Sequence, residues 1–297
     1  MAAIEAHGLG KSFGGRSACR DVSFAVERGE VFGFLGPNGA GKTTTLRMLA
    51  GLFAPDTGTA RVAGCEIGPG RPGGPQLRGK VGLLTESPGF YDRLTARENL
   101  VYFARLQGAR EPERKSDALL ERFALRDRAG SPFAELSRGM KQKLAIARAL
   151  VHDPEVILLD EPTVGLDPEA TREVRNLVAD LAATEATIVL CTHHLEEVER
   201  LCSRAAFIAG RLVAVHEIRG GNLLRIELAA PFQPDAVRPL CHSLRISGTT
   251  LVIEPRAEVA DIVAALVHSG ARIEAVSPHQ DRLEDAWLDL LAEARAA

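Results

Sequence analysis

The sequence predicts an α/β fold in which a larger domain of alternating strands and helices precedes a small α+β domain. Three apolar runs, at residues 31–35, 156–159 and 187–192, have the length and composition of strands buried on both faces of a parallel sheet. Segments with helical spacing of apolar residues lie between them. Towards the C-terminus the composition changes. We therefore place the larger domain at residues 1–216 and the smaller one at residues 217–297.

Composition narrows the class of protein. The chain has 297 residues, of which 45% are hydrophobic and 25% charged, as in ordinary globular proteins. Its net charge of -3 gives no overall attraction to nucleic acid, and no nucleic-acid partner is expected. The N-terminus lacks a signal-peptide pattern, and no window approaches the ~20 apolar residues of a membrane span. We expect a protein that is neither secreted by that route nor itself transmembrane.

The five cysteines are scattered without a C-x-x-C pair, which argues against a disulfide framework. One cluster could hold zinc: Cys191, His193, His194 and Cys202. However, Cys191 ends an apolar strand and Cys202 lies on an apolar helix face, where unreactive thiols are common. We therefore interpret Cys191 and Cys202 as unreactive thiols and not as zinc ligands.

Residues 4 to about 31 are expected to form short strands, with a turn at Gly14-Gly15 and a hairpin at residues 27–30. They would make an N-terminal β-subdomain. Phe13, in a polar turn, can stack on a base or pack at a strand end, and the residues alone leave both interpretations open. The later segments are a strand, an irregular loop and a buried strand, at residues 59–62, 67–75 and 81–84.

A glycine-rich stretch follows the first apolar run and leads into a helix. It fits the P-loop pattern G-x-x-x-x-G-K-[ST]. Glycines let the backbone wrap round an anion, and the helix start adds the positive end of its macrodipole. Lys42 can reach the β- and γ-phosphates, and the Thr43 hydroxyl suits Mg²⁺. The stretch predicts binding of a nucleoside triphosphate by Gly36, Pro37, Asn38, Gly39, Ala40, Gly41, Lys42, Thr43 and Thr44.

Two carboxylates follow the second apolar run. Burying the carboxylates of Asp160 and Glu161 at a strand end costs free energy unless a cation or water lies nearby. Active sites of open α/β sheets lie at that edge. Asp160 can hold Mg²⁺, directly or through water. Glu161 is placed to orient an attacking water or accept its proton.

Polar residues also end the third apolar run. A histidine at this edge can hydrogen-bond a γ-phosphate or water. We favour His193 for that role and regard His194 as structural. Asp167 stands before a helix with an apolar stripe and can serve as its N-cap. These alternating elements predict a doubly wound domain.

Residues from about 91 to 150 interrupt the alternation with a helical subdomain. Thr95 and Glu98 have the spacing of a capping box. The smaller domain has the order βαββαβ plus a helix, which suggests a ferredoxin-like fold. Its segments are strand 223–228, helix 234–240, hairpin 244–254, helix 259–266, strand 271–276 and a final helix at 283–294. It carries no visible chemistry, so we interpret it as a packing or dimer-contact module.

One further stretch points to a family. Residues 136–143 are Leu-Ser-Arg-Gly-Met-Lys-Gln-Lys and stand at a helix start, with Ser137 23 residues before Asp160. A serine hydroxyl, a glycine and a helix N-terminus make a second anion site. The stretch resembles the L-S-G-G-Q signature of ATP-binding-cassette (ABC) ATPases, and with the other motifs the resemblance covers residues 4 to about 215.

The resemblance implies a role for each motif, with ATP and Mg²⁺ as cofactors. Phe13 corresponds to the adenine-stacking aromatic, Gly36 to Thr44 to Walker A, and Asp160 with Glu161 to the end of Walker B. Ser137 and Gly139 match the signature, Asp167 the D-loop and His193 the switch histidine. Glu86 stands where the family usually has a glutamine that links Mg²⁺ to the transmembrane partner.

The resemblance also implies partners. Two ATPase subunits, identical or close paralogues, would pair head to tail, each signature closing on the other's γ-phosphate. They would lie at the cytoplasmic face of the cell membrane, beneath separately encoded transmembrane permease subunits. Within the family, the residues that depart from the usual motifs, together with Arg-Leu-Glu-Asp-Ala-Trp at residues 282–287, make the chain most similar to the ATPase subunits of ABC-2-type exporters of drugs, lipids, polysaccharides or sodium.

Three departures from the family pattern leave alternatives. Glu86 replaces Gln, Arg138 replaces the first signature Gly, and Met140 replaces its Gln. A nucleotide-sensing subunit with little turnover would tolerate such changes. A soluble ATPase acting on ribosomes or DNA is a second alternative, but the insertion of about 55 residues is short for a coiled-coil arm.

Overall fold

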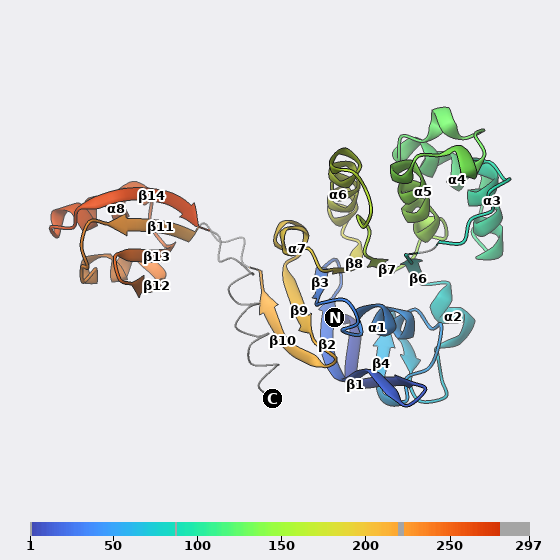
Figure 1. Cartoon of the computed structure of the whole chain (residues 1–297), viewed down its shortest axis with the longest axis horizontal. Helices are drawn as coiled ribbons and strands as arrows, with labels where there is room; N and C mark the ends of the chain where they lie inside the picture. Colours follow the sequence, from blue (N-terminus) through green and yellow to red (C-terminus); the bar gives the residue numbers. More distant parts are fainter. Residues whose placement is uncertain (1, 87, 219–222, 280–297) are drawn as a thin grey trace. The chain divides into compact units, whose positions relative to one another are not determined.

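The computed structural model describes residues 2–86, 88–218 and 223–279, which form two compact units divided between residues 218 and 223 (Figure 1). The first unit has two sheets and a group of helices. The second has one sheet with a helix. Each unit has its own apolar core. Within the described residues, no helix is both long and apolar enough to cross a bilayer.

The first sheet of the first unit is antiparallel, in the order β2-β1-β4-β5. Its strands are β1 (Ala2–Phe13), β2 (Arg16–Glu27), β4 (Thr57–Val62) and β5 (Cys65–Ile67). The turn at Gly14-Gly15 is confirmed, with φ of 54° and 79°. β1 and β2 are 12 residues each, longer than the short strands expected. Buried residues alternate along most of β2 because one face packs on the core.

The second sheet has the order β10-β9-β3-β8-β7-β6. Its strands are β3 (Val31–Leu35), β6 (Val81–Leu84), β7 (Val156–Asp160), β8 (Thr187–Thr192), β9 (Arg204–Ile208) and β10 (Leu212–Glu217). All neighbours pair in parallel except β9 and β10. This confirms the three apolar runs as buried parallel strands.

The expected hairpin at residues 27–30 is wrong. β2 pairs with β1 in the first sheet, whereas β3 pairs with β8 and β9 in the second, so the turn passes the chain from one sheet to the other. The reason is burial: every residue of β3 is buried, and such a strand fits the middle of a parallel sheet.

Helices surround the parallel sheet. They are α1 (Lys42–Leu49), α2 (Gly74–Arg78), α6 (Pro168–Ala182) and α7 (Leu195–Leu201). The helical subdomain comprises α3 (Ala96–Leu106), α4 (Pro112–Arg122), the short 3₁₀ turns η1 (Arg126–Arg128) and η2 (Phe133–Glu135), and α5 (Arg138–Leu150), grouped together in Figure 1. The capping box is confirmed. Thr95 Oγ1 accepts from Glu98 N at 3.1 Å, and Glu98 Oε2 accepts from Thr95 N at 2.8 Å.

The second unit is ferredoxin-like, as predicted. Its elements are β11 (Leu223–Leu228), η3 (Asp235–Leu240), β12 (Cys241–Ser247), β13 (Thr250–Pro255), α8 (Val259–His268) and β14 (Ile273–His279). The sheet is antiparallel, in the order β12-β13-β11-β14. The first helix is a 3₁₀ segment because Pro239 lies inside it. The helix expected at 283–294 lies outside the described residues.

Candidate functional site

The P-loop connects β3 to α1 at the carboxyl edge of the parallel sheet. Gly41 is the N-cap of α1, with φ of 96°. A Cβ on Gly36 would lie 2.3 Å from Ile208 O, and one on Gly41 would lie 2.5 Å from Ala18 O. These glycines therefore let the loop pack directly against neighbouring backbone, which leaves its N–H groups on a tightly curved turn.

Lys42 is buried at the base of this loop, with 5% of its surface exposed. Its Nζ donates to Gly36 O at 2.6 Å and to Pro37 O at 3.3 Å, and it lies 3.5 Å from Glu161 Oε1. A buried ammonium needs such partners, and together they hold the charge against the loop. The positive charge is therefore fixed at the base of the loop, beside Glu161.

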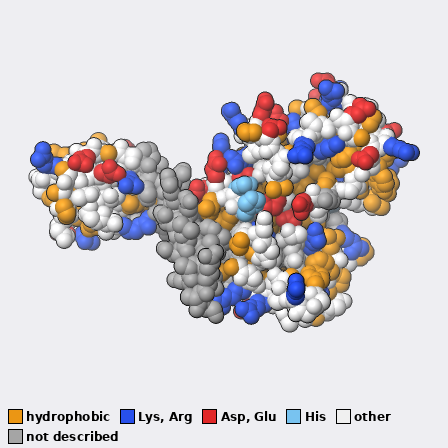
Figure 2. All heavy atoms as spheres, in the orientation of Figure 1, with side chains coloured by type: hydrophobic (Ala, Val, Ile, Leu, Met, Phe, Trp, Pro, Cys, Tyr) orange, Lys and Arg blue, Asp and Glu red, His pale blue; other side chains and the backbone are white. Residues whose placement is uncertain are grey.

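The loop lines a pocket of about 480 Å³, which we call the P-loop pocket. Its walls are Ala18, Val164, Glu86, Glu161 and His193 together with residues 37–44. Residues that follow the ends of β3, β6, β7 and β8 thus converge at this pocket. Figure 2 shows histidine and acidic side chains close together on the surface of the first unit.

Thr43 and Asp160 lie beside this pocket. Thr43 Oγ1 donates to Asp160 Oδ1 at 3.1 Å, and the carboxylate is only 3% exposed. Burial raises the pKa of Asp160, and the nearby Glu161 charge adds to the effect, while the Thr43 hydrogen bond opposes it. A carboxylate and a hydroxyl held together are ligands that suit Mg²⁺. These two side chains fit a magnesium ion that accompanies a nucleotide.

Glu161 and His193 form a pair at the same edge. His193 Nδ1 lies 2.9 Å from Glu161 Oε2 and 3.0 Å from Oε1. The Glu161 backbone has φ of 49°, and its N–H donates to Cys191 O at 2.9 Å. The His194 ring packs beside that of His193, with centroids 4.1 Å apart, and does not line the pocket. A carboxylate between an ammonium and an imidazole can orient and deprotonate water.

The signature residues lie at a separate pocket of about 230 Å³, which we call the signature pocket. Ser137 caps α5, its Oγ accepting from Met140 N at 3.2 Å. Asp167 caps α6, its Oδ1 accepting from Ala170 N at 2.9 Å. Ser137, Gly139 and Asp167 all line this pocket, and no residue lines both pockets. The structure therefore brings these three together, apart from the P-loop.

Gly139 has a packing role that the sequence did not reveal. A Cβ there would lie 2.9 Å from the Ala170 Cβ, so the glycine allows α5 and α6 to approach closely. The absence of a side chain at Gly139 thus permits the close approach of the two helix starts that form the signature pocket.

Two further residues that the sequence predicts for the site, Glu86 and Phe13, are exposed. Glu86 is exposed just after β6 and lines the P-loop pocket. Phe13 is 51% exposed, and its ring meets Phe53 edge-on at 5.5 Å. It is not among the residues that line the P-loop pocket, so adenine stacking by Phe13 stays a prediction.

Sequence reasoning missed Ala18 and Val164, which line the P-loop pocket. Ala18 lies on β2 in the other sheet, and no local pattern distinguishes it. Val164 is an exposed apolar residue three positions after Glu161, and that proximity was the available signal.

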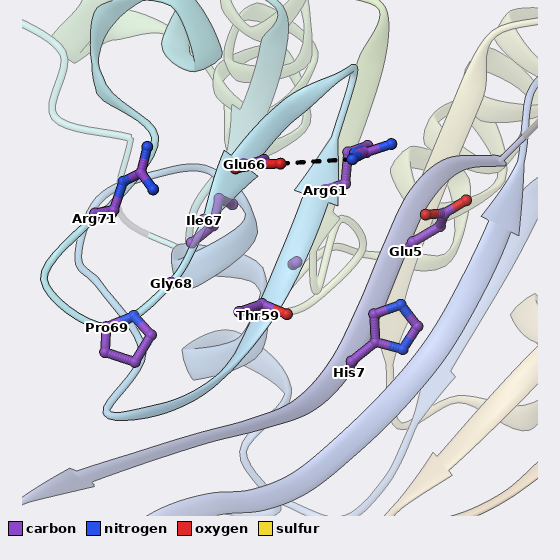
Figure 3. Close-up of a pocket in the computed structure, with 10 residues that line it drawn as sticks. Glu5, His7, Thr59, Arg61, Glu66, Ile67, Gly68, Pro69 and Arg71 are labelled. Atoms are coloured by element: carbon purple, nitrogen blue, oxygen red, sulfur yellow. Dashed lines mark ion pairs between the residues drawn. The ribbon is translucent and has the colours of Figure 1, made fainter.

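Another pocket, of about 400 Å³, lies on the outer face of the antiparallel sheet (Figure 3). Glu5 and His7 come from β1, Arg61 from β4 and Glu66 from β5, with an Arg61–Glu66 ion pair of 3.5 Å. Its side chains carry both charges, and it contains none of the predicted site residues. Within the part of the chain that the structure describes, no three His, Cys, Asp or Glu residues form a metal site.

The parallel sheet, its P-loop and the acidic strand end define a P-loop nucleoside triphosphatase. Comparison with known proteins gives the family: residues 19–164 match the family described as ABC transporter. The chain is 43% identical over 263 residues to the Nod factor export ATP-binding protein I of Paraburkholderia xenovorans (strain LB400), covering 84% of this chain and 85% of that protein. It is 33% identical over 297 residues to a linearmycin resistance ATP-binding protein of Bacillus subtilis (strain 168), covering 99% and 90%.

Solved structures agree. An ATP-binding subunit of an ABC transporter is 33% identical, with a TM-score of 0.64 over 72% of this chain and 90% of that one. A dimeric ATP-binding cassette in a post-hydrolysis state, bound to ADP and Pi, is 25% identical, with a TM-score of 0.65 over 73% and 99%. The chain belongs to the ATP-binding proteins of the ABC transporter family and is an ABC transporter ATPase.

Proposed function

We propose that this chain is the ATPase subunit of an exporter and works as a head-to-tail pair beneath separately encoded permease subunits at the cytoplasmic membrane face. The observation that carries the pairing is that no residue lines both pockets, so each chain offers two distinct sites and a nucleotide in the P-loop pocket leaves the signature pocket for a partner. The export role is supported by the relatives, which are named for Nod factor export and linearmycin resistance.

In this proposal, residues 1–216 are the ATP-binding domain, with a helical subdomain at about 91–150, and residues 217–297 are an accessory domain. The P-loop backbone and Lys42 bind the phosphates. Thr43 and Asp160 would hold Mg²⁺, which would supply positive charge that neutralises the phosphates. Glu86 lies near enough to the pocket to join them.

Hydrolysis is assigned to the Glu161–His193 pair. Glu161 orients the attacking water and takes its proton, and its carboxylate is held by His193 on one side and Lys42 on the other. Ser137 and Gly139, at the start of α5, offer a hydroxyl and backbone N–H groups to the partner's nucleotide. Most of the catalytic effect is positioning and charge stabilisation.

The test is Glu161→Gln in the full-length chain. This change keeps the shape of the side chain but removes the base, so ATP hydrolysis should fall by about 100-fold or more. ATP binding should persist, and light scattering should detect a stable ATP-dependent dimer. Asp180→Asn, at an exposed carboxylate of α6, is the matched control and should hydrolyse normally. A Glu161→Gln protein with the parental rate would contradict the proposal.

A further inference from the structure

The backbone around Glu161 is strained. Its φ of 49° lies in the left-handed region, which a glutamate adopts rarely and retains only where the surroundings hold it. The orientation of the carboxylate towards His193 and Lys42 depends on this conformation. The contacts that hold the next two residues, Pro162 and Thr163, therefore bear on catalysis.

Two side chains hold those residues. From α5, Gln142 Nε2 donates to Pro162 O at 2.7 Å. From α7, Glu197 Oε1 accepts a hydrogen bond from the buried Thr163 hydroxyl. The turn after Glu161 is thus fastened to the helix that begins beside Ser137 and to the helix that comes after His193.

Glu197 is an unusual residue for a helix core. It is 1% exposed, and its Oε1 also accepts from Arg175 Nε of α6 at 3.3 Å. Its Oε2 has no hydrogen-bond partner in the described parts of the chain. A buried carboxylate that is only half satisfied destabilises a fold relative to an apolar side chain of similar size. Packing alone therefore does not account for Glu197.

The position of Glu197 relative to the catalytic pair explains why a buried carboxylate is present. Glu197 stands four residues after His193, and Thr163 stands two residues after Glu161. The Thr163–Glu197 hydrogen bond consequently ties the turn that follows Glu161 to α7, the helix that begins two residues after His193. Arg175 ties the same carboxylate to α6, whose N-cap is Asp167.

We propose that Glu197, acting through Thr163, is a positioning residue for ATP hydrolysis that keeps Glu161 at hydrogen-bond distance from His193. This rests on the proposed role of Glu161. Neither Thr163 nor Glu197 touches the P-loop pocket, so loss of their contact changes the orientation of Glu161 and leaves the nucleotide-binding groups in place.

The experiment compares Thr163→Val, which removes the hydroxyl at constant shape, with Thr163→Ser, which keeps it. In the full-length chain, Thr163→Val should lower kcat by about 10- to 100-fold, as expected for a displaced catalytic group, with KM for ATP within about twofold. Thr163→Ser should restore kcat to within about threefold. Thr184→Val, which removes an exposed hydroxyl bonded to Leu181 O, is the control and should leave kcat unchanged.

A second arm separates positioning from general damage. In a Glu161→Gln background, Thr163→Val should lower the residual single-turnover rate no further, because the group it positions is already gone. Glu197→Met should reproduce the Thr163→Val effect. Arg175 has a second ion-pair partner, Glu196 at 3.2 Å in the parent chain, so this change should not leave the guanidinium unpaired. The double variant Thr163→Val with Glu197→Met should be no slower than either alone.

Several results would overturn the inference. They are a parental kcat for Thr163→Val, an equal loss of ATP affinity and kcat, a failure of serine to rescue, or a further loss in the Glu161→Gln background. If Glu161→Gln itself hydrolyses ATP normally, the proposed function fails first, and the two failures are thereby distinguished. Should Thr163→Val not fold, Glu197→Met still decides the matter, because it removes the other partner of the same hydrogen bond.

Discussion

Single residues at the sheet edge carry most of the predicted chemistry. Lys42, Glu161 and His193 lie on three different segments, yet the Glu161 carboxylate is 3.5 Å from Lys42 Nζ and 2.9 Å from His193 Nδ1. The arrangement arises because β3, β7 and β8 run in parallel, so that the segments after these strands start from one edge of the sheet.

At this scale, Lys42→Ala tests the phosphate site. Removing the ammonium loses a charge-assisted contact worth about 1.5–3 kcal/mol, so ATP affinity should fall by about 10- to 150-fold. Isothermal titration calorimetry measures this directly. Lys80→Ala, which removes an ammonium bonded to Ala63 O away from the pocket, should bind ATP normally. Unchanged affinity in Lys42→Ala would count against the P-loop assignment.

At the scale of helices and strands, close helix contacts and hydrogen-bonded turns set how neighbouring elements are positioned. The contact of α5 with α6 at Gly139 is one such approach, and it brings Ser137 and Asp167 to the same pocket. The turn between β2 and β3 is held by hydrogen bonds to a neighbouring strand. There, Glu30 Oε1 and Oε2 accept from Arg204 of β9 at 2.7 and 2.8 Å.

Gly139→Ala tests the helix approach. The added Cβ would press on the Ala170 Cβ at 2.9 Å, and overpacking of this kind costs about 1–3 kcal/mol, partly offset by the better helix propensity of alanine. Urea denaturation should report a net destabilisation of about 1 kcal/mol. Gly130→Ala, where an added Cβ meets nothing within 4 Å, should change stability by less than about 0.5 kcal/mol. Equal effects in both variants would refute the packing role.

Glu30→Gln tests the turn between the sheets. Burial alone would raise the pKa of Glu30, but hydrogen bonds from Arg204 and from the Glu27 backbone outweigh it and lower the pKa below 4.5. A lowered pKa means that ionised Glu30 stabilises the fold above its unfolded pKa and that this stabilisation is lost as pH falls through the folded pKa. Glu30→Gln should therefore cost about 1–3 kcal/mol at pH 7.

The pH dependence supplies the control for that variant. The difference in free energy of unfolding between Glu30→Gln and the parent should shrink progressively below pH 4.5. A difference that stays constant from pH 7 to pH 3 would show that charge at Glu30 does not contribute.

For the whole molecule, the division into two units has a functional consequence. All residues that line the P-loop and signature pockets lie within residues 2–218. The second unit has a separate core built from its own sheet and α8, with Ile226, Leu251 and Leu266 fully buried.

Accordingly, a chain ending at residue 218 should bind ATP within about threefold of the full-length affinity, because compact units with their own cores fold independently. Calorimetry on both proteins checks this, and circular dichroism confirms that the shorter chain is folded. A folded but non-binding short chain would show that residues beyond 218 contribute to the nucleotide site.

Much of this protein could be predicted from the sequence alone. Local patterns identified the P-loop, the carboxylates after residue 159, His193, the capping box at Thr95 and the ferredoxin-like order of the second unit. All but the ferredoxin-like order depend on spacing within a short segment, and the parallel-strand rule then brings the strand ends together. The same local view produced the wrong hairpin at residues 27–30, because pairing partners are chosen by burial and not by the turn.

Tertiary structure alone decided the rest. It placed Ala18 of another sheet in the P-loop pocket, brought Ser137, Gly139 and Asp167 to one pocket, and joined Thr163 to Glu197 across 34 residues. It also gave Glu161 its left-handed conformation. Motifs can be read from sequence because backbone and side chain interact within a few residues. Contacts between distant segments depend on how the whole chain packs, since their distances are set by the core and not by spacing along the chain.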